Sequence, residues 1–163
     1  MSIRSTYGLG FLIICVILGT SFYLQLVSGV LPCPLCTLQR FSFILLGVLL
    51  LVGFIFNAHR FGRLIINLLA ALVSLAGCIL AGRQVWLQHS PNANAGECGV
   101  SLDYMLKVLP LNEVMQKVFT GSAECTQRGW EFLKLTMAEW SLLWFAIFFI
   151  VLLYALMREF NSR

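Results

Sequence analysis

Four long apolar stretches with almost no charged residues constrain what this chain can fold into more than any other feature of its sequence. They cover approximately residues 8–27, 41–57, 64–81 and 140–157. A helix needs roughly 20 apolar residues to cross the hydrocarbon core of a bilayer, which is about 30 Å thick. The second stretch is the shortest, so its helix either tilts little or continues into its flanks. We therefore expect an all-α membrane protein, a bundle of four transmembrane helices that forms a single domain over residues 1–163.

The composition agrees with a protein that is solvated mainly by lipid. Of the 163 residues, 60% are hydrophobic and 11% are charged, whereas a soluble domain carries about 25% charged residues. The net charge of +4 comes from Lys and Arg residues that are scattered between the apolar stretches. A nucleic-acid groove combines basic density with interleaved aromatic residues, and no segment of the sequence does so. The sequence therefore argues against a nucleic-acid partner.

The first apolar stretch follows Arg4 and in this respect is similar to a secretory signal peptide. It is longer than the apolar region of a typical signal peptide, and another hydrophobic stretch follows at once. We therefore expect the first stretch to be retained as a transmembrane helix.

The arginines predict the orientation of the bundle. Five of them lie at the N-terminus, between the second and third stretches, or in the C-terminal tail. They are Arg4, Arg60, Arg63, Arg158 and Arg163. With four spans these three places lie on one side, which the positive-inside rule assigns to the cytoplasm. The outer side receives two loops, at about 28–40 and 87–139, and acidic residues outnumber basic ones in the longer loop. All four tryptophans fall at or near the outer interface, which indole rings prefer.

The six cysteines divide between the apolar stretches and the outer loops. Cys15 and Cys78 lie inside apolar stretches, where a thiol behaves as a small and inert hydrophobic group. The four cysteines of the outer loops are Cys33, Cys36, Cys98 and Cys125. On the outer side of a bacterial inner membrane disulfides persist, and four cysteines allow three pairings. The short spacing favours Cys33–Cys36, which leaves Cys98–Cys125.

The chemistry of the C-x-x-C pair has three interpretations. As a structural staple, a Cys98–Cys125 bond would close a long loop, whereas Cys33–Cys36 closes a very short ring and constrains the unfolded chain little. A structural zinc site needs four nitrogen or sulfur ligands, typically from two such pairs, and this sequence has one. We therefore expect no metal site, and we interpret Cys33 and Cys36 as a redox-active pair.

The block "CPLCTLQR" adds an arginine to this pair. If the second helix begins near Pro34, Cys36 lies in its first turn and Arg40 lies one turn further along. The partial positive charge of a helix N-terminus and a nearby guanidinium both favour the thiolate form of a cysteine. Cys36 is therefore the candidate thiolate, and Cys33 is better placed for exchange with another sulfur. An alternative for Arg40 is that its side chain only extends to the lipid headgroups.

The longer outer loop carries apolar residues at helical spacing in "LDYMLKVLPLNEVMQKVF", interrupted at Pro110. This pattern predicts short amphipathic helices that lie on the membrane surface. The preceding "PNANAGECG" is rich in Gly, Asn and Pro, which are typical of turns and loops. Such a segment suits the docking of Cys98 into the groove of a partner protein.

Together these features resemble the disulfide bond formation protein B (DsbB) family, the quinone-coupled thiol oxidases of the bacterial inner membrane. The resemblance covers nearly the whole chain. It rests on "CPLCTLQR", on "GRQVWLQH", on the single cysteines in "GECG" and "AECTQRGWEFLKLTMAEW", and on the order of the four spans. It implies a protein-dithiol:quinone oxidoreductase whose partner is a soluble, thioredoxin-like periplasmic oxidase of the DsbA type.

The resemblance also implies a role for each outer cysteine. Cys98 forms a mixed disulfide with the reduced partner, and Cys125 is released to attack Cys33. Cys36 is then the leaving thiolate, next to the quinone. When the partner leaves in its oxidised form, the electrons rest on the C-x-x-C pair and pass to the quinone.

The implied cofactor is a membrane quinone, either ubiquinone or menaquinone, with Arg40 and His89 as the residues that bind it. A soluble oxidase of this type has a potential of about −120 mV, so glutathione at roughly −200 mV would reduce it. A quinone dissolved in the bilayer is an acceptor that drives the reaction forwards. The alternative for His89 is a solvated histidine at the membrane interface.

Two other classes of protein compete with this interpretation. Vitamin K epoxide reductase-like oxidases also join thiols to quinones on four helices, but their C-x-x-C pair lies at a later helix, whereas here it precedes the second. A non-enzymatic membrane scaffold with stapled loops is the other alternative, and it predicts no quinone-dependent oxidation of a dithiol protein. The sequence contains no haem-attachment, nucleotide-binding or catalytic-serine signature.

Overall fold

Four long helices form the structure, which is a computed structural model. It describes residues 3–28, 33–56, 59–89, 107–108, 110, 113 and 131–161. The helices are α1 (Ile3–Ser28), α2 (Pro34–Phe56), α3 (Arg60–His89) and α7 (Met137–Asn161). Each of them is long and apolar enough to cross a membrane. The predicted four helices of membrane-spanning length and apolar composition are therefore confirmed.

The helices extend beyond the apolar stretches into more polar sequence. One extension is at the start of α2, which begins at Pro34, as expected from the C-x-x-C block, and not at Phe41. Proline suits this place because the first turn of a helix needs no N–H from it, and its φ is already helical. The extra turns bring "CPLCTLQR" into the helix and lengthen the shortest predicted span.

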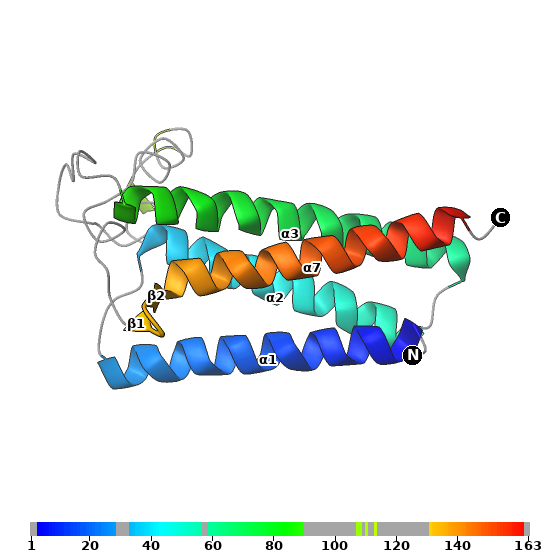
Figure 1. Ribbon diagram of the computed structural model, residues 1–163, viewed down its shortest axis with the longest axis horizontal. Helices are drawn as coiled ribbons and strands as arrows, with labels where there is room; N and C mark the ends of the chain where they lie inside the picture. Colours follow the sequence, from blue (N-terminus) through cyan, green and yellow to red (C-terminus); the bar gives the residue numbers. More distant parts are fainter. Residues whose placement is uncertain are drawn as a thin grey trace.

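The helices pack in the order of the chain, α1 on α2, α2 on α3 and α3 on α7. In Figure 1 they run lengthwise, with α7 in front of α2 and with α3 and α1 on opposite sides. The two termini lie at one end of the bundle, which we call the terminal end. The start of α2, the end of α3 and the start of α7 lie at the other end, which we call the cysteine end because it holds Cys33 and Cys36.

The core at the middle of the bundle depends on a stacked pair of phenylalanines. The rings of Phe43 and Phe145 stack with centroids 3.9 Å apart and planes inclined by 15°. Phe145 reaches this place because Gly77 of α3 has no side chain, since a Cβ there would lie 2.4 Å from the Phe145 ring. Many large apolar side chains on the outside of the bundle are exposed. A surface of this kind suits a bilayer, because soluble monomers rarely expose such extended apolar patches.

A two-stranded hairpin precedes α7, and the sequence analysis did not predict it. Strands β1 (Glu131–Phe132) and β2 (Leu135–Thr136) pair antiparallel. The turn residues Leu133 and Lys134 have φ values of 54° and 66°. Positive φ at both central positions is typical of a type I′ turn, for which Asn-Gly is the usual sequence signal. Leu-Lys carries no such signal.

The start of α7 is capped by its own side chains. The Glu139 carboxylate accepts a hydrogen bond from the Thr136 amide at 2.7 Å, and the Glu139 amide donates to Thr136 Oγ1 at 3.4 Å. This reciprocal pair is a capping box, which satisfies two amides that the helix leaves unpaired. The predicted amphipathic helices over 102–118 lie almost wholly outside the described residues, where only Lys107–Val108, Pro110 and Glu113 are included.

Candidate functional site

Cys33 of the C-x-x-C pair directly precedes α2, and Cys36 lies in the first turn of this helix. The Cys33 carbonyl accepts the Thr37 amide at 3.0 Å, which is the first hydrogen bond of the helix. Cys33 Sγ accepts the Cys36 amide at 3.2 Å, so this sulfur takes the place of the oxygen in an ordinary N-cap side chain. Cys33 is 5% exposed and Cys36 is partly buried. Both cysteines therefore lie at the positive end of the α2 dipole, where a thiolate is favoured.

Two buried glutamines connect this turn to α3. Gln84 Nε2 of α3 donates a hydrogen bond to Cys36 Sγ at 3.1 Å. Gln39 Nε2 of α2 donates to Gln84 Oε1 at 2.7 Å. Gln39 is 3% exposed and Gln84 is 4% exposed. Three groups in a row, two amides and one sulfur, therefore form a hydrogen-bonded chain between the helices.

Neither glutamine was predicted from the sequence as a site residue. Both lie in the blocks "CPLCTLQR" and "GRQVWLQH", and each is an uncharged amide in an otherwise apolar helix. Gln39 also follows Cys36 by three residues, which brings both to one face of α2. The hydrogen bond from Gln84 to Cys36 joins residues that are 48 positions apart in the sequence, so no local sequence pattern indicates it.

Arg40 is bound mainly to α1. Its Nε donates to Ser21 Oγ at 2.9 Å and its Nη2 donates to the Ser21 carbonyl at 3.3 Å. Its Nη1 donates to Gln25 Oε1, and its Cζ lies 5.1 Å from the centre of the Phe22 ring. In the part of the chain that the structure describes, these contacts hold the guanidinium against α1, while the Arg40 backbone stays one turn beyond Cys36. The arginine therefore joins α1 to α2 beside the cysteine pair.

His89 is the last residue of α3 and contacts α7. Its Nδ1 lies 3.0 Å from the Val85 carbonyl, and its Nε2 lies 3.7 Å from Glu139 Oε1. The side chain is 49% exposed. It lies five residues beyond Gln84, which corresponds to about 7.5 Å of helix rise. His89 is therefore at the same end of the bundle as Cys36 and in contact with solvent.

Known proteins are similar in sequence to this chain over its full length. The family model "Disulfide bond formation protein DsbB" matches residues 3–155. A disulfide bond formation protein B of Marinobacter nauticus is 38% identical over 163 residues, which cover 100% of this chain and 97% of that protein. The chain belongs to the DsbB family.

Other relatives of the same family agree. A disulfide bond formation protein B of Hahella chejuensis is 39% identical over 156 residues, 96% of this chain and 94% of that protein. Disulfide bond formation protein B 1 of Pseudomonas aeruginosa is 42% identical over 145 residues, 89% of each chain. The predicted DsbB resemblance is confirmed, and membership of this family decides against the vitamin K epoxide reductase-like alternative.

For a DsbB-family chain, the described cysteines have the expected positions. Cys33 and Cys36 start α2, while Cys15 and Cys78 lie within α1 and α3. Cys98 and Cys125 are outside the described residues, so their predicted disulfide stays a prediction, as does the Cys33–Cys36 disulfide. The site that the structure describes is therefore the C-x-x-C half of the predicted four-cysteine system.

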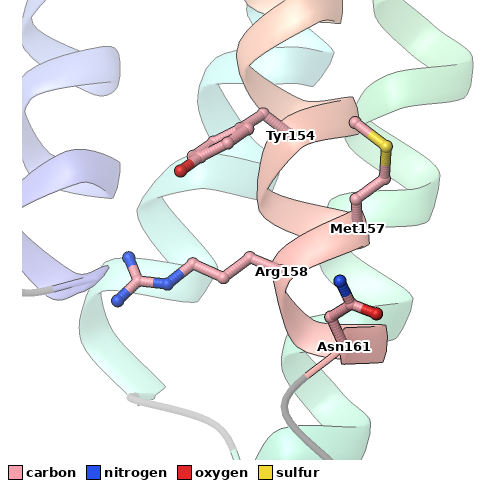
Figure 2. A pocket seen from close by; sticks show the side chains of 4 residues that line it. All are labelled: Tyr154, Met157, Arg158 and Asn161. Atoms are coloured by element: carbon pink, nitrogen blue, oxygen red, sulfur yellow. The ribbon is translucent and has the colours of Figure 1, made fainter.

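The terminal end of the DsbB-family bundle has different chemistry. Figure 2 shows a hollow near the end of α7, lined by Tyr154, Met157, Arg158 and Asn161. A second cavity of about 450 Å³ lies between α1 and α7, and none of its lining residues is a cysteine. Arg63 Nε lies 2.8 Å from Glu159 Oε1 at this end and joins α3 to α7. Both of these hollows therefore lie away from Cys33 and Cys36.

Proposed function

We propose that this chain is a protein-dithiol:quinone oxidoreductase that generates disulfides. It oxidises a soluble periplasmic oxidase of the DsbA type and passes the electrons to a membrane quinone, which sustains disulfide formation in periplasmic proteins. The observation that carries the proposal is the position of the C-x-x-C pair, with Cys33 capping α2 and Cys36 in its first turn. The positive end of a helix stabilises a leaving thiolate.

The exchange begins at the longer outer loop. A thiolate of the reduced partner attacks Cys98 in the Cys98–Cys125 disulfide, and Cys125 leaves as a thiolate. Cys125 attacks Cys33, a Cys33–Cys125 bond forms, the Cys33–Cys36 bond breaks, and Cys36 leaves as a thiolate. The second thiol of the partner then displaces Cys98, and the partner departs with its own disulfide.

The reduced pair is completed in the next exchange. Cys98 attacks Cys125 in the Cys33–Cys125 disulfide, which restores Cys98–Cys125 and releases Cys33. Two electrons that came from the partner now rest on Cys33 and Cys36. The N-terminus of α2 holds this negative charge beside the membrane, because the helix dipole favours anions there.

The residues beside Cys36 fit a quinone. The Arg40 guanidinium has five N–H groups and makes three hydrogen bonds to α1, so with respect to the described residues two N–H groups remain for a carbonyl oxygen. The neighbouring Phe22 and Phe41 side chains are exposed on the apolar outside of the bundle. A bound quinone supplies the final acceptor for two electrons and two protons. Arg40 would hold and polarise one carbonyl oxygen, and His89, half exposed and 3.7 Å from Glu139, would exchange protons with solvent.

We place the protein in the bacterial inner membrane with both termini in the cytoplasm. Figure 1 has both termini at one end of the bundle, and the side chains of Arg60, Arg63 and Arg158 belong to the helix ends there. The positive-inside rule favours the cytoplasm for this end. The cysteine end then faces the oxidising periplasm, where disulfides persist.

Reconstitution tests the function. The purified chain in lipid nanodiscs is mixed with a reduced DsbA-type protein and a short-chain ubiquinone or menaquinone, and partner thiols and quinol are measured together. We expect partner oxidation and quinol formation in equal amounts. Cys36→Ala should stop both, whereas Cys78→Ala should retain both. A chain that oxidises no partner with either quinone, or oxidises it equally well as Cys36→Ala, contradicts the proposal.

A further inference from the structure

We propose that Gln84 is a further catalytic residue of this site, and that Gln39 is the residue that positions it. The Gln84 side-chain amide donates to Cys36 Sγ and stabilises the thiolate that leaves when the Cys33–Cys36 bond opens. The inference rests on the proposed function, because it assigns Cys36 as the leaving sulfur. It adds a donor from α3 to a thiol–disulfide exchange whose cysteines belong to the start of α2 and to the outer loops.

The backbone around Cys36 explains why a side-chain donor is useful. The Cys36 amide, which a helix N-terminus would offer to a nearby anion, donates to Cys33 Sγ at 3.2 Å. Gln84 Nε2 instead reaches Cys36 Sγ itself, at 3.1 Å. The two sulfurs of the pair therefore have different donors, one from the helix backbone and one from the neighbouring helix.

Gln39 determines which end of the Gln84 amide faces the sulfur. A side-chain amide has one oxygen that accepts and one NH₂ group that donates. Gln39 Nε2 donates to the Gln84 oxygen at 2.7 Å, so the Gln84 NH₂ group is directed to Cys36. Rotating the Gln84 amide by half a turn would bring two NH₂ groups together and turn an oxygen toward the sulfur. In a site where both glutamines are at most 4% exposed, such unsatisfied groups are costly.

A purely structural role needs only part of this arrangement. Polar side chains often join helices within membranes, and the Gln39–Gln84 bond alone would join α2 to α3. Tyr7 and Asn67 form such a pair between α1 and α3, with a hydrogen bond of 2.8 Å. The Gln84 bond to Cys36 is the additional feature, because its acceptor is an atom that gains charge in the reaction.

The step that Gln84 assists conserves atoms and electrons. A thiolate attacks Cys33 Sγ, a new sulfur–sulfur bond forms, the Cys33–Cys36 bond breaks, and its electron pair remains on Cys36 Sγ. The hydrogen bond from Gln84 strengthens as this negative charge develops, since bonds to charged acceptors are stronger than neutral ones. Gln84 therefore favours both the opening of the disulfide and the reduced form of the pair.

The thiolate can be measured directly. In a Cys33→Ser background, the rate at which iodoacetamide alkylates Cys36 is followed against pH by mass spectrometry of its peptide. We expect Gln84→Met to move the midpoint upward by about one pH unit, a tenfold smaller thiolate fraction at a fixed lower pH. Gln39→Met should move it in the same direction and by less, because Gln84 keeps its NH₂ group but loses its orientation. Asn67→Leu is the matched control, since it removes a buried interhelical bond about 25 Å away along α3, and should leave the midpoint unchanged.

The reduction potential gives a second readout on the protein with both cysteines. In defined thiol–disulfide buffers, the Cys33–Cys36 pair of Gln84→Met should become more reducing, by about 30 mV for a tenfold change in the equilibrium constant. If Gln84→Met fails to fold, Gln84→Asn replaces it, because the shorter side chain retains an amide but withdraws it from the sulfur.

Unchanged midpoint and potential in a folded Gln84 variant would overturn the proposal, as would an equal shift in Asn67→Leu. Both measurements are made without partner or quinone. A negative result therefore leaves the proposed oxidoreductase function untouched, and failure of the reconstituted reaction leaves the measured role of Gln84 in the Cys36 thiolate intact.

Discussion

The two ends of the bundle both join helices through polar side chains, but they use opposite kinds of chemistry. At the terminal end Arg63 and Glu159 neutralise one another across a 2.8 Å ion pair between α3 and α7. At the cysteine end neutral amides of Gln39 and Gln84 are arranged in series and end on the sulfur of Cys36. The ion pair neutralises charges that are present throughout, whereas the series of amides directs a donor to a sulfur that gains negative charge in the proposed reaction.

This comparison makes separable predictions for the two ends. Substitutions at the cysteine end should change thiol and quinone chemistry and affect unfolding little. Substitutions at the terminal end should change the free energy of unfolding and leave the thiol chemistry as it is.

The largest expected effect is a trapped covalent complex. In Cys125→Ser the partner's thiolate cannot open an intramolecular disulfide, so we expect Cys98 to be captured by oxidised partner in cells as a stable mixed disulfide. Non-reducing electrophoresis and mass spectrometry of the complex measure this. Cys98→Ser is the matched control and should yield no such adduct through position 98. If Cys125→Ser forms no adduct with the partner, the proposal that Cys98 reacts with the partner on the outer side of the membrane is wrong.

The next effect concerns the terminal end. Arg63→Met leaves the Glu159 side chain, which is 10% exposed, without its ion-pair partner. Because both side chains lie near the end of the bundle, we expect a loss of about 2 kcal/mol, less than for a fully buried pair. Thermal unfolding in detergent measures it, and adding Glu159→Gln should recover part of the loss. A changed Cys36 alkylation midpoint in Arg63→Met would contradict the separation of the two ends.

A smaller effect is expected at Arg40. Lysine keeps the positive charge but lacks the planar fork that bonds Ser21 and Gln25 and leaves donors for a quinone oxygen. We expect Arg40→Lys to raise the KM for quinone by roughly tenfold, the value of one charged hydrogen bond, and Arg40→Met to raise it further. Steady-state oxidation at varied quinone concentration measures this, while stopped-flow measurement of the first exchange with the partner should change much less.

The Ser21→Ala variant separates the contact of Arg40 with α1 from its proposed contact with quinone. It removes one α1 contact but leaves the guanidinium in place, so its effect on the quinone KM should be smaller than that of Arg40→Lys. If quinone dependence is unchanged in both Arg40 variants, then Arg40 serves only to join α1 to α2.

The sequence by itself determined the four helices and the position of the cysteine pair. Apolar length is a local property, and a chain of this hydropathy has to satisfy its backbone within helices when it enters lipid. The start of α2 could also be anticipated, because Pro34 follows Cys33 and favours the first turn of a helix. For the same reason Cys36 was correctly placed in that turn.

The tertiary structure alone decided what surrounds the pair. The partner of Cys36 is 48 residues away on α3, and Arg40 bonds to Ser21 and Gln25 of α1. The hairpin before α7 turns at Leu133 and Lys134, neither of which is typical of its turn type. The physical reason is common to all of these: hydropathy and capping act along the chain, whereas the direction of a polar side chain depends on which groups the packed neighbouring helices present to it.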